Sequence, residues 1–414
     1  MRHTSQQETL HEFQVRLFKE AKSNPGKKFN NIHHWLWDEE VLTLAWESVK
    51  KNKGVGGVDN LNIDDIESHG VTKFLNNIRF EIKNGSYEPS PVKRVYIPKS
   101  NGRLRPLGIA TIKDRVAQTA VKLVIEPIFE AGFEEFSYGF RPDRSTKNAC
   151  TAVCRWLNAG CVNVFDADIV SCFDSIPHNR LMEQVKRRFA DTYILSLIDS
   201  WLCAGILEKG KLHYTDKGTP QGGVISPLLS NIYLDQFDKK WKINETGVRK
   251  KAHLVRYADD FVILSEGLIS FEPVKKILNS LELRVNREKT RILHAKNGFD
   301  FLGFHFKLIR QQDKQKAAVT PTSKSLKKVI EKINELTGEN NFHVPPERLI
   351  IRINQVLSSW ASYYSDTGSS GAMKHIQDYC EECVRNCVQC YKGVPKNQIS
   401  DKYLHEELGL VRIV

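Results

Sequence analysis

Leu254-Val255-Arg256-Tyr257-Ala258-Asp259-Asp260-Phe261-Val262-Ile263-Leu264 holds two adjacent aspartates near its centre. Two short apolar, β-rich runs flank a pair of aspartates, which predicts a tight hairpin with carboxylates at its tip. Neighbouring carboxylates repel each other, so a folded protein that keeps both ionised usually holds a cation beside them. An Asp-Asp pair is also ordinary turn chemistry. A third carboxylate from elsewhere in the chain would favour the cation.

Asp168 is a candidate for that third carboxylate. The segment Val162 to Ile169 alternates apolar and polar residues, which is the period of a half-buried strand, and Asp168 lies near its C-terminal end. If this strand pairs with the hairpin, Asp168 and Asp259 can face each other across a divalent metal site. Mg²⁺ binds carboxylate and phosphate oxygens. Two such ions roughly 3.5–4 Å apart are the arrangement that polymerases use for in-line phosphoryl transfer.

The composition favours a nucleic-acid partner. The chain has 414 residues, of which 41% are hydrophobic, and a formal net charge of +12. Its length suggests two or three domains. Its basic charge favours nucleic acid over membrane, although a merely basic protein would show the same total. The charge is also clustered, with eight Lys or Arg residues between His305 and Lys332 and a second run at Lys93, Arg94, Lys99, Arg103 and Arg105.

Neither a membrane span nor a secretory leader is expected. No apolar run approaches the roughly 18 residues of a span, and the first residues lack the apolar core of a signal peptide. Nine scattered cysteines fit reduced thiols and a cytoplasmic location. Cys380, Cys383, Cys387 and Cys390 resemble zinc spacing. However, they fall in a segment without Gly or Pro that reads as one helix, where they form a stripe roughly 15 Å long, so a packed helical face is favoured over a metal site.

The remaining pattern gives the order of elements. Residues 1–90 look helical, with a loop at Gly54 to Asp59; strands are predicted at 92–98 and 104–109, and a helix at 114–129. Residues 160–304 alternate strands and helices. Three further helices are predicted at 323–336, 346–364 and 372–391. A Gly-rich loop, Gly218-Thr219-Pro220-Gln221-Gly222-Gly223, precedes an apolar helix and lets the backbone approach a ligand closely.

In chain order, the sequence holds a basic strand pair, an aspartate strand, a Gly-rich loop and an aspartate hairpin. With these residues, that order resembles the reverse transcriptases, and among them the group II intron-encoded reverse transcriptase/maturase family. The strings that carry the resemblance cover nearly the whole chain: Ile97-Pro98-Lys99, Arg105-Pro106-Leu107-Gly108-Ile109, Tyr138-Gly139-Phe140-Arg141-Pro142, Phe165-Asp166-Ala167-Asp168-Ile169, Gly218 to Gly223 with Ser226-Pro227-Leu228-Leu229-Ser230-Asn231, Tyr257-Ala258-Asp259-Asp260, Asn286-x2-Lys289-Thr290, Phe301-Leu302-Gly303-Phe304 and Trp360-Ala361-Ser362-Tyr363-Tyr364.

The resemblance implies an α+β right-hand polymerase, with fingers, an α/β palm that carries an antiparallel catalytic hairpin, and a helical thumb. The implied divisions are a helical extension of the fingers at 1–90, fingers at 91–160, a palm with interleaved fingers elements at 161–308, and a thumb or maturase-like region at 309–414. Only 24 residues follow Cys390, so a Cys/His-type endonuclease domain is not expected, and a DNA-binding domain is expected to be absent or rudimentary.

The resemblance also implies roles for individual residues. Asp168, Asp259 and Asp260 would be catalytic and, with the Ile169 carbonyl, would hold two Mg²⁺ ions, for which Mn²⁺ could substitute. Lys99 and Arg105 would clamp the triphosphate, or else contact the template backbone. Phe173 would exclude a ribose 2′-hydroxyl, or else belong to the core. Gln221 would contact the nucleotide or cap a helix. Lys289 would serve the leaving pyrophosphate or be a solvated lysine. Asp166 is expected to be a structural strand neighbour and Asp174 a helix cap.

The implied function is RNA-directed DNA polymerisation with Mg²⁺ and deoxynucleotides, on an RNA template with a DNA or RNA primer. Binding of intron RNA to assist splicing is expected beside it. The alternatives are a mainly RNA-binding maturase, or a host-domesticated reverse transcriptase in DNA repair or antiviral defence. An RNA-dependent RNA polymerase is disfavoured by Tyr257 and Phe173. The protein is expected to act as a monomer or homodimer.

Overall fold

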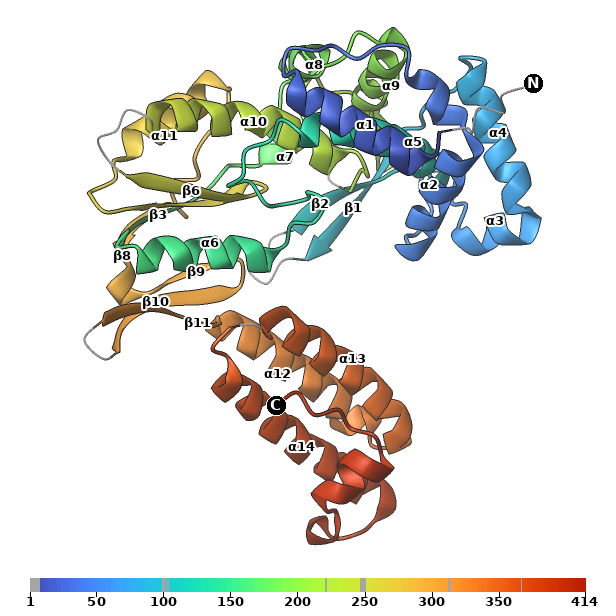
Figure 1. The fold of residues 1–414 in the computed structure, drawn as a ribbon. Coiled ribbons are helices and arrows are strands. Elements are labelled where there is room, and N and C mark those ends of the chain that lie inside the picture. Colours follow the sequence, from blue (N-terminus) through green and yellow to red (C-terminus); the bar gives the residue numbers. More distant parts are fainter. Residues whose placement is uncertain are drawn as a thin grey trace, which may run out of the picture.

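The computed structural model describes residues 8–98, 102, 104–219, 222–245, 251–311, 314–365 and 367–414. It divides into a larger part of helices and two sheets and a smaller helical bundle below it, joined through the strands at 299–321 (Figure 1). Three hydrophobic cores follow this division, with two in the larger part and one in the bundle. In the described residues, no helix is long and apolar enough to cross a membrane.

The N-terminal region is helical, as the sequence predicts. It comprises α1 (Leu10–Ser23), η1 (His33–Trp37), α2 (Glu39–Lys51), α3 (Ile63–His69) and α4 (Val71–Lys83), which pack around α5 (Ile112–Glu130). A capping box between Thr9 and Glu12 starts α1. The predicted loop at 54–59 is also present. A Cβ on Gly57 would lie 2.6 Å from the backbone nitrogen of Thr111, so this glycine permits a close backbone approach.

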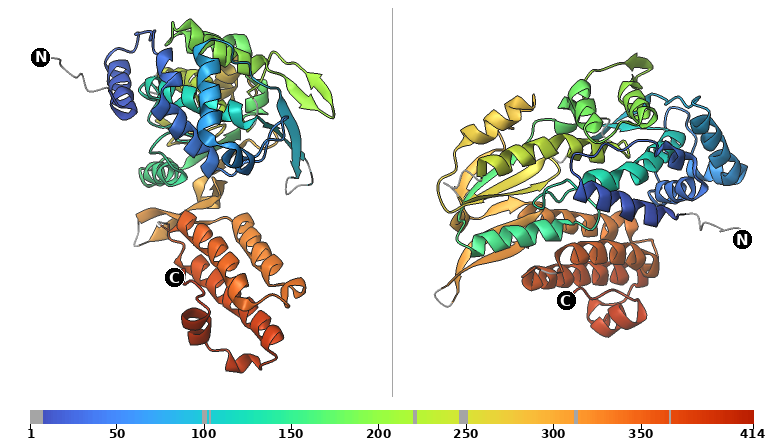
Figure 2. Two further views of the ribbon diagram at one scale, coloured as in Figure 1. Left: turned by 90° about the vertical axis from the view of Figure 1, so that its right-hand side faces the viewer. Right: turned by 45° about the horizontal axis from the view of Figure 1, so that its top comes forward.

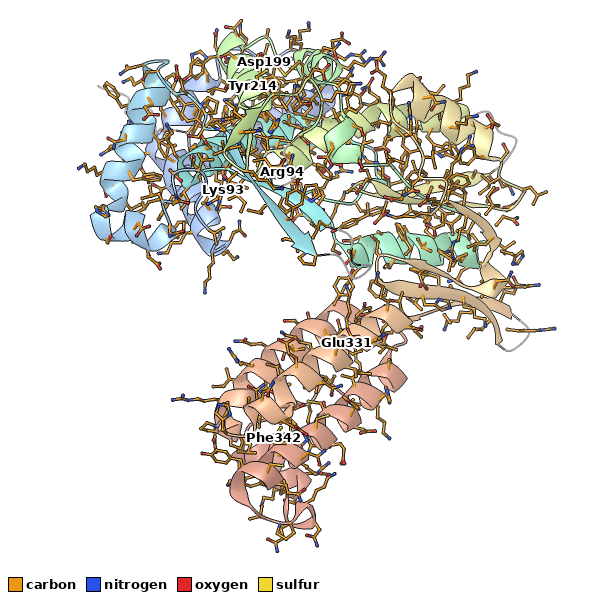
Figure 3. All side chains as sticks on the ribbon, turned by 180° about the vertical axis from the view of Figure 1, so that it is seen from behind. Lys93, Arg94, Asp199, Tyr214, Glu331 and Phe342 are labelled. Atoms are coloured by element: carbon orange, nitrogen blue, oxygen red, sulfur yellow. The ribbon has the colours of Figure 1, made fainter. Side chains whose placement is uncertain are left out.

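The first sheet carries basic residues on its first two strands in chain order. It has the order β2-β1-β4-β5, built from β1 (Val92–Pro98), β2 (Leu104–Ile109), β4 (Ile206–Glu208) and β5 (Lys211–His213). The two predicted strands at 92–98 and 104–109 are confirmed as an antiparallel pair. Seen from behind, Lys93 and Arg94 lie on this sheet, above the bundle that bears Glu331 and Phe342 (Figure 3).

The second sheet carries the aspartates. Its order is β6-β7-β3-β8, all antiparallel, with β3 (Asn163–Asp168), β6 (Ala252–Tyr257), β7 (Asp260–Ser265) and β8 (Arg291–His294). Side chains alternate between its faces. Phe165 and Phe261 enter the core that contains α10 (Ser226–Glu245), whereas Val164 and Val262 enter the core that contains α6 (Thr146–Asn158). Figure 1 shows α10 above this sheet and α6 below it.

Shorter helices complete the larger part. They are α7 (Cys172–Ser175), α8 (His178–Lys186), α9 (Thr192–Cys203) and α11 (Phe271–Ser280), with η2 at Ala295–Asn297. Three residues separate α7 from β3, whose last residue, Asp168, pairs with Asp260 beside the turn of the β6–β7 hairpin.

The bundle consists of α12 (Ser323–Thr337), α13 (Pro346–Tyr364) and α14 (Ser370–Lys392), which confirms the three helices predicted at the C-terminal end. Short segments η3 (Glu339–Asn341), η4 (Lys396–Gln398) and η5 (Tyr403–Glu407) complete it. The left view in Figure 2 shows the bundle below the sheets. A three-stranded sheet joins the two parts, with β9 (Phe299–Phe301), β10 (Phe304–Gln311) and β11 (Lys314–Pro321).

The joint between the parts is a pair of tyrosines. The hydroxyl of Tyr363 donates to the carbonyl of Leu302 at 2.8 Å, and that of Tyr364 donates to the carbonyl of Gly303 at 3.0 Å. Both acceptors lie in the turn between β9 and β10, and both residues have a positive φ. α13 is therefore tied to this turn by bonds to backbone atoms.

Candidate active site

The β6–β7 hairpin places the aspartate pair at its tip. The two strands pair from Ala252–Ser265 to Tyr257–Asp260, which leaves Ala258 and Asp259 as the turn. Ala258 has a φ of 57°, a left-handed conformation that strains a residue with a side chain. The predicted hairpin is therefore confirmed, and its turn is held in a conformation that the surrounding contacts must support.

Arg256 supplies that support, and the sequence analysis did not single it out. Its side chain is fully buried, and Nε donates to Oδ1 of Asp238 on α10 at 2.8 Å. Another nitrogen of the same guanidinium donates to the carbonyl of Ala258 at 2.9 Å, and a third to the hydroxyl of Ser137 at 2.7 Å. The sequence does offer a signal for this residue, because it is a charged residue inside the apolar run before the aspartates. A buried arginine is almost always paired, so a buried partner could have been expected.

The segment at 136–139 packs directly against the same hairpin. The backbone nitrogen of Tyr138 donates to the carbonyl of Arg256 at 2.9 Å. A Cβ on Gly139 would lie 2.4 Å from the backbone nitrogen of Ala258, so only glycine fits there. The hairpin tip is thus fixed from both α10 and this segment.

Asp168 meets the hairpin across strands β3 and β7. The register pairs Asp168 with Asp260, whereas Asp259 lies in the adjoining turn. That Asp168 and Asp259 face each other across a metal ion stays a prediction, because the backbone register does not test it. Strand periodicity indicates which face a residue takes but not which residue it pairs with on the neighbouring strand.

Burial and neighbouring carboxylates raise the pKa of both aspartates of the pair. Burial, followed by the charges of Asp259 and Asp168, raises the pKa of Asp260 to about 7. Burial also raises the pKa of Asp259, with a further contribution from Asp168. The shifts have the causes expected when like charges share a pocket with limited access to water.

Lys289 partly balances this charge. Its ammonium nitrogen lies 2.5 Å from Oδ2 of Asp168, and this hydrogen bond raises the pKa of the lysine. Across the described ranges, no three His, Cys, Asp or Glu side chains are grouped closely enough to hold a metal ion. The donor set still fits a hard cation, because carboxylate oxygens with raised pKa values are what Mg²⁺ would stabilise. Asp168, Asp259 and Asp260 would hold such an ion, and Lys289 now binds one carboxylate oxygen of Asp168.

The aspartates open into a cavity of about 1220 Å³. Its lining brings together most of the predicted site residues from distant parts of the chain, namely Arg105, Asp168, Ile169, Phe173, Asp259, Asp260 and Lys289. Tyr363 and Leu302 reach it from the joint with the bundle. We call this cavity the catalytic pocket below.

Phe173 and Ile169 take distinct positions in this pocket. Phe173 is half-buried, and its ring lies edge-on to Phe140 with a centroid separation of 6.5 Å. Ile169 forms an isolated β-bridge with Val285. The two backbone hydrogen bonds of this bridge are made by the residues next to Ile169 and Val285 and not by Ile169 itself. The bridge therefore leaves the carbonyl of Ile169 out of its hydrogen bonds, although the side chain is buried.

Two predicted site residues, Lys99 and Gln221, lie outside the described residues. The position after Gln221 is described. Gly222 has a φ of 108°, and a Cβ there would lie 2.8 Å from the carbonyl oxygen of Gly108 on β2. The Gly-rich loop thus approaches the backbone of β2 closely, whereas its predicted approach to a ligand stays a prediction.

Two predicted structural aspartates differ in outcome. Asp166 pairs in register with Arg291 of β8, and burial raises its pKa to about 6. The prediction for Asp174 as a helix cap is wrong, because Ser171 occupies that position and Asp174 lies inside the first turn of α7. The helix begins at Cys172, so its cap lies three residues before Asp174.

The four C-terminal cysteines lie along α14. Cys380 and Cys387 are buried in the core of the bundle, and the thiol of Cys387 donates to the carbonyl of Thr337 at 3.1 Å. Their helix packs against α12 and α13 through this face.

Comparison with known proteins agrees with this geometry. Residues 97–306 match the family "Reverse transcriptase (RNA-dependent DNA polymerase)", and residues 326–404 match the "Group II intron, maturase-specific domain". The chain is 34% identical to Protein YkfC of Escherichia coli over 74% of this chain and 90% of that protein. It is 30% identical to the group II intron-encoded protein LtrA of Lactococcus lactis over 71% of this chain.

The chain spans different shares of these relatives. The matched region covers 59% of LtrA and 38% of a putative COX1/OXI3 intron 2 protein of Saccharomyces cerevisiae, to which the chain is 30% identical. The matched reverse transcriptase domain implies a right-hand polymerase fold, divalent metal ions and a nucleic-acid partner, and the second domain implies intron RNA. The chain belongs to the family of group II intron-encoded reverse transcriptases and maturases.

Proposed function

We propose that this protein polymerises DNA on an RNA template in the catalytic pocket. The observation that carries the proposal is the meeting of Asp168, Asp259 and Asp260 in one open cavity with Arg105 and Phe173. Three carboxylates that line one cavity repel each other, and a protein that only binds RNA has no physical need for them. Family membership supports the same chemistry.

The chain's own residues suggest a division of labour. Asp168, Asp259 and Asp260, with the carbonyl of Ile169, would hold two Mg²⁺ ions. When bound, these ions lower the pKa of the primer 3′-hydroxyl and neutralise charge on the phosphates. Arg105 would bind the triphosphate through its fork of donors. The ring of Phe173 would exclude a 2′-hydroxyl.

Lys289 would act on the leaving group. Its ammonium is held by Asp168 and lies in the same pocket. A cation beside Asp168 would release it to bind the leaving pyrophosphate or to donate a proton to it. Lys99 and Gln221 would complete the nucleotide contacts.

We also propose how the right-hand plan maps onto the chain. The N-terminal helices at 1–90 and the region at 91–160 would form the fingers, residues 161–308 the palm and residues 309–414 the thumb. The sheet that bears the aspartates supports the palm assignment, and the bundle that reaches the pocket through Tyr363 supports the thumb.

Primer extension tests this proposal. The wild-type chain should extend a DNA primer on an RNA template with deoxynucleotides, and much less with ribonucleotides. Asp259→Ala should abolish extension, whereas Glu272→Gln should retain it, because Glu272 is an exposed carboxylate of α11 outside the pocket lining. Equal extension by wild type and Asp259→Ala would contradict the metal assignment. A preference for ribonucleotides would contradict the role of Phe173.

A second proposed activity is assistance of intron splicing. The match of residues 326–404 to the maturase-specific domain supports it. The test is splicing of an intron transcribed from the gene's surroundings, with and without the protein, at near-physiological Mg²⁺. Splicing that is independent of the protein would contradict this activity while leaving polymerisation intact.

A further inference from the structure

A second large cavity lies on another side of the molecule. It has a volume of about 770 Å³ and forms where α1, α5 and α8 end beside the middle of α10. It shares no lining residue with the catalytic pocket. In Figure 1 these four helices meet in the upper part of the molecule, on the side of α10 away from the bundle. We call this cavity the α10 cavity.

The floor of the α10 cavity is apolar and aromatic. Ile128, Phe129, Phe133 and Ile232 line it, and each is buried. The ring of Phe129 packs against Phe189, with centroids 5.5 Å apart. An open cavity of this size with an apolar floor falls in the range of small-molecule and cofactor sites, and base rings bury well on such surfaces.

Polar groups converge above this floor. Gln184 lines the cavity although only 9% of its surface is exposed, and Gln236 and Asp235 lie along α10. Asp235 uses one carboxylate oxygen for Lys239. Among the described residues, its other oxygen, Oδ1, is buried without a hydrogen-bond partner. Amide and carboxyl groups beside an aromatic floor are the groups that read the edge of an unstacked base.

The rim of the α10 cavity is cationic. Lys22, Arg187, Arg188, Lys239 and Lys240 line it, against the single carboxylate of Asp235. Some of these cations cap helix ends. Arg188, for example, donates to the carbonyl of Ala21 near the end of α1 at 3.2 Å. Helix capping does not account for the exposed Lys22 and Arg187, nor for the hollow and its unpartnered oxygen.

We propose that the α10 cavity binds one unstacked nucleotide of an RNA molecule that lies outside the catalytic pocket. The base packs on Phe129 and Phe133, its edge meets Gln184 and Asp235, and Arg187 with its neighbours binds the phosphate. This inference rests on the proposed function only in taking RNA as the partner. It adds a docking point that fixes the position of a folded RNA relative to the polymerase.

The first test uses mononucleotides. AMP, CMP, GMP and UMP are added separately to the full chain, with the catalytic pocket filled by a chain-terminated primer on its template and the next deoxynucleotide. Saturation-transfer NMR should give signals on the base protons of at least one nucleotide. These signals should disappear in Ile232→Trp, which fills the floor. No base signal in wild type, or an equal signal in Ile232→Trp, would overturn the proposal.

Arg187→Glu provides a variant that leaves the core unchanged, because Arg187 is exposed. It should weaken binding of the same nucleotide at least tenfold. Lys19→Glu, on the exposed side of α1 and outside the cavity lining, should leave the binding affinity unchanged. Equal affinities in the two variants would overturn the phosphate assignment.

The second test uses a 4-thiouridine-substituted single-stranded RNA. Photo-crosslinking should label peptides from 128–133 or 232–240, and the label should be lost in Ile232→Trp. Crosslinks confined to the catalytic pocket would overturn the proposal. Primer extension on a short template should be unchanged in both cavity variants. Failure of extension in wild type would instead refute the proposed function, so the two failures are distinguishable.

Discussion

Among single residues, Arg256 combines a buried ion pair with support of the catalytic hairpin. It is a fully buried charge that pairs with the fully buried Asp238 and also holds the strained turn at Ala258. A buried pair adds little over a well-packed apolar pair, but removing one partner leaves an uncompensated charge. The residue therefore positions the aspartates and does not itself contact substrate.

Arg256→Met should destabilise the protein by about 3–5 kcal/mol, because Asp238 is left unpaired. Urea unfolding measures this change. The double variant Arg256→Met, Asp238→Leu should recover much of the stability but not primer extension, since the carbonyl of Ala258 still lacks its donor. Full activity in the double variant would contradict the positioning role.

Asp235 gives a pH dependence whose sign follows from its environment. Burial raises its pKa from 3.8 to about 6 in the folded chain. Between these values the folded state binds more protons than the unfolded state, so stability falls as pH rises from about 4 to 6. Asp235→Asn should therefore be more stable than wild type at pH 8, by about 1–3 kcal/mol, and equal to it near pH 4. Thermal unfolding across this range measures the difference, and a pH-independent gap would contradict the assignment.

At the scale of elements, the hairpin depends on its neighbour at 136–139. Gly139→Ala would drive a Cβ into the backbone of Ala258. The resulting displacement of the tip should lower the extension rate about 100-fold, the cost of misplacing reacting groups by roughly 1 Å. Template binding should persist. Gly371→Ala is the matched control, because a Cβ there meets nothing within 4 Å. Similar rates in the two variants would show that the hairpin tolerates the shift.

Much of this element order could be predicted from the sequence. The helix at Pro346–Tyr364 and the strands at 92–98 and 104–109 have the predicted bounds, because periodicity and turn residues mark them locally. The pairing of Asp168 with Asp260 could not be predicted, since register is set by contacts between distant segments. The apolar run around Arg256 indicates a buried, paired charge, but its partner Asp238 lies on α10 and could not be identified from local sequence. The α10 cavity, formed by four helices far apart in sequence, also escaped prediction.

At the scale of the whole molecule, charge should govern template binding. With a net charge of +12, affinity for an RNA–DNA duplex should fall steeply with salt, about 10³–10⁵-fold between 50 and 200 mM if six to ten phosphates are contacted. Filter binding over a salt series measures this slope. Lys307 and Lys316 lie on the exposed face of the β10–β11 hairpin. We expect the double variant Lys307→Ala, Lys316→Ala to lower the slope of log affinity against log salt concentration by about two. A salt-insensitive affinity would contradict backbone tracking.

The tyrosine joint has a consequence for how this molecule can vary. Tyr363 and Tyr364 bind the carbonyls of Leu302 and Gly303, and the ring of Phe304 packs against both tyrosine rings. A Cβ on Gly303 would lie 3.1 Å from the hydroxyl of Tyr364, so the joint depends on particular side chains on both of its sides. An exchange of this bundle for another one is therefore expected to succeed only if the tyrosine pair, Phe304 and Gly303 are kept, whereas residues of the bundle away from the joint are free to differ.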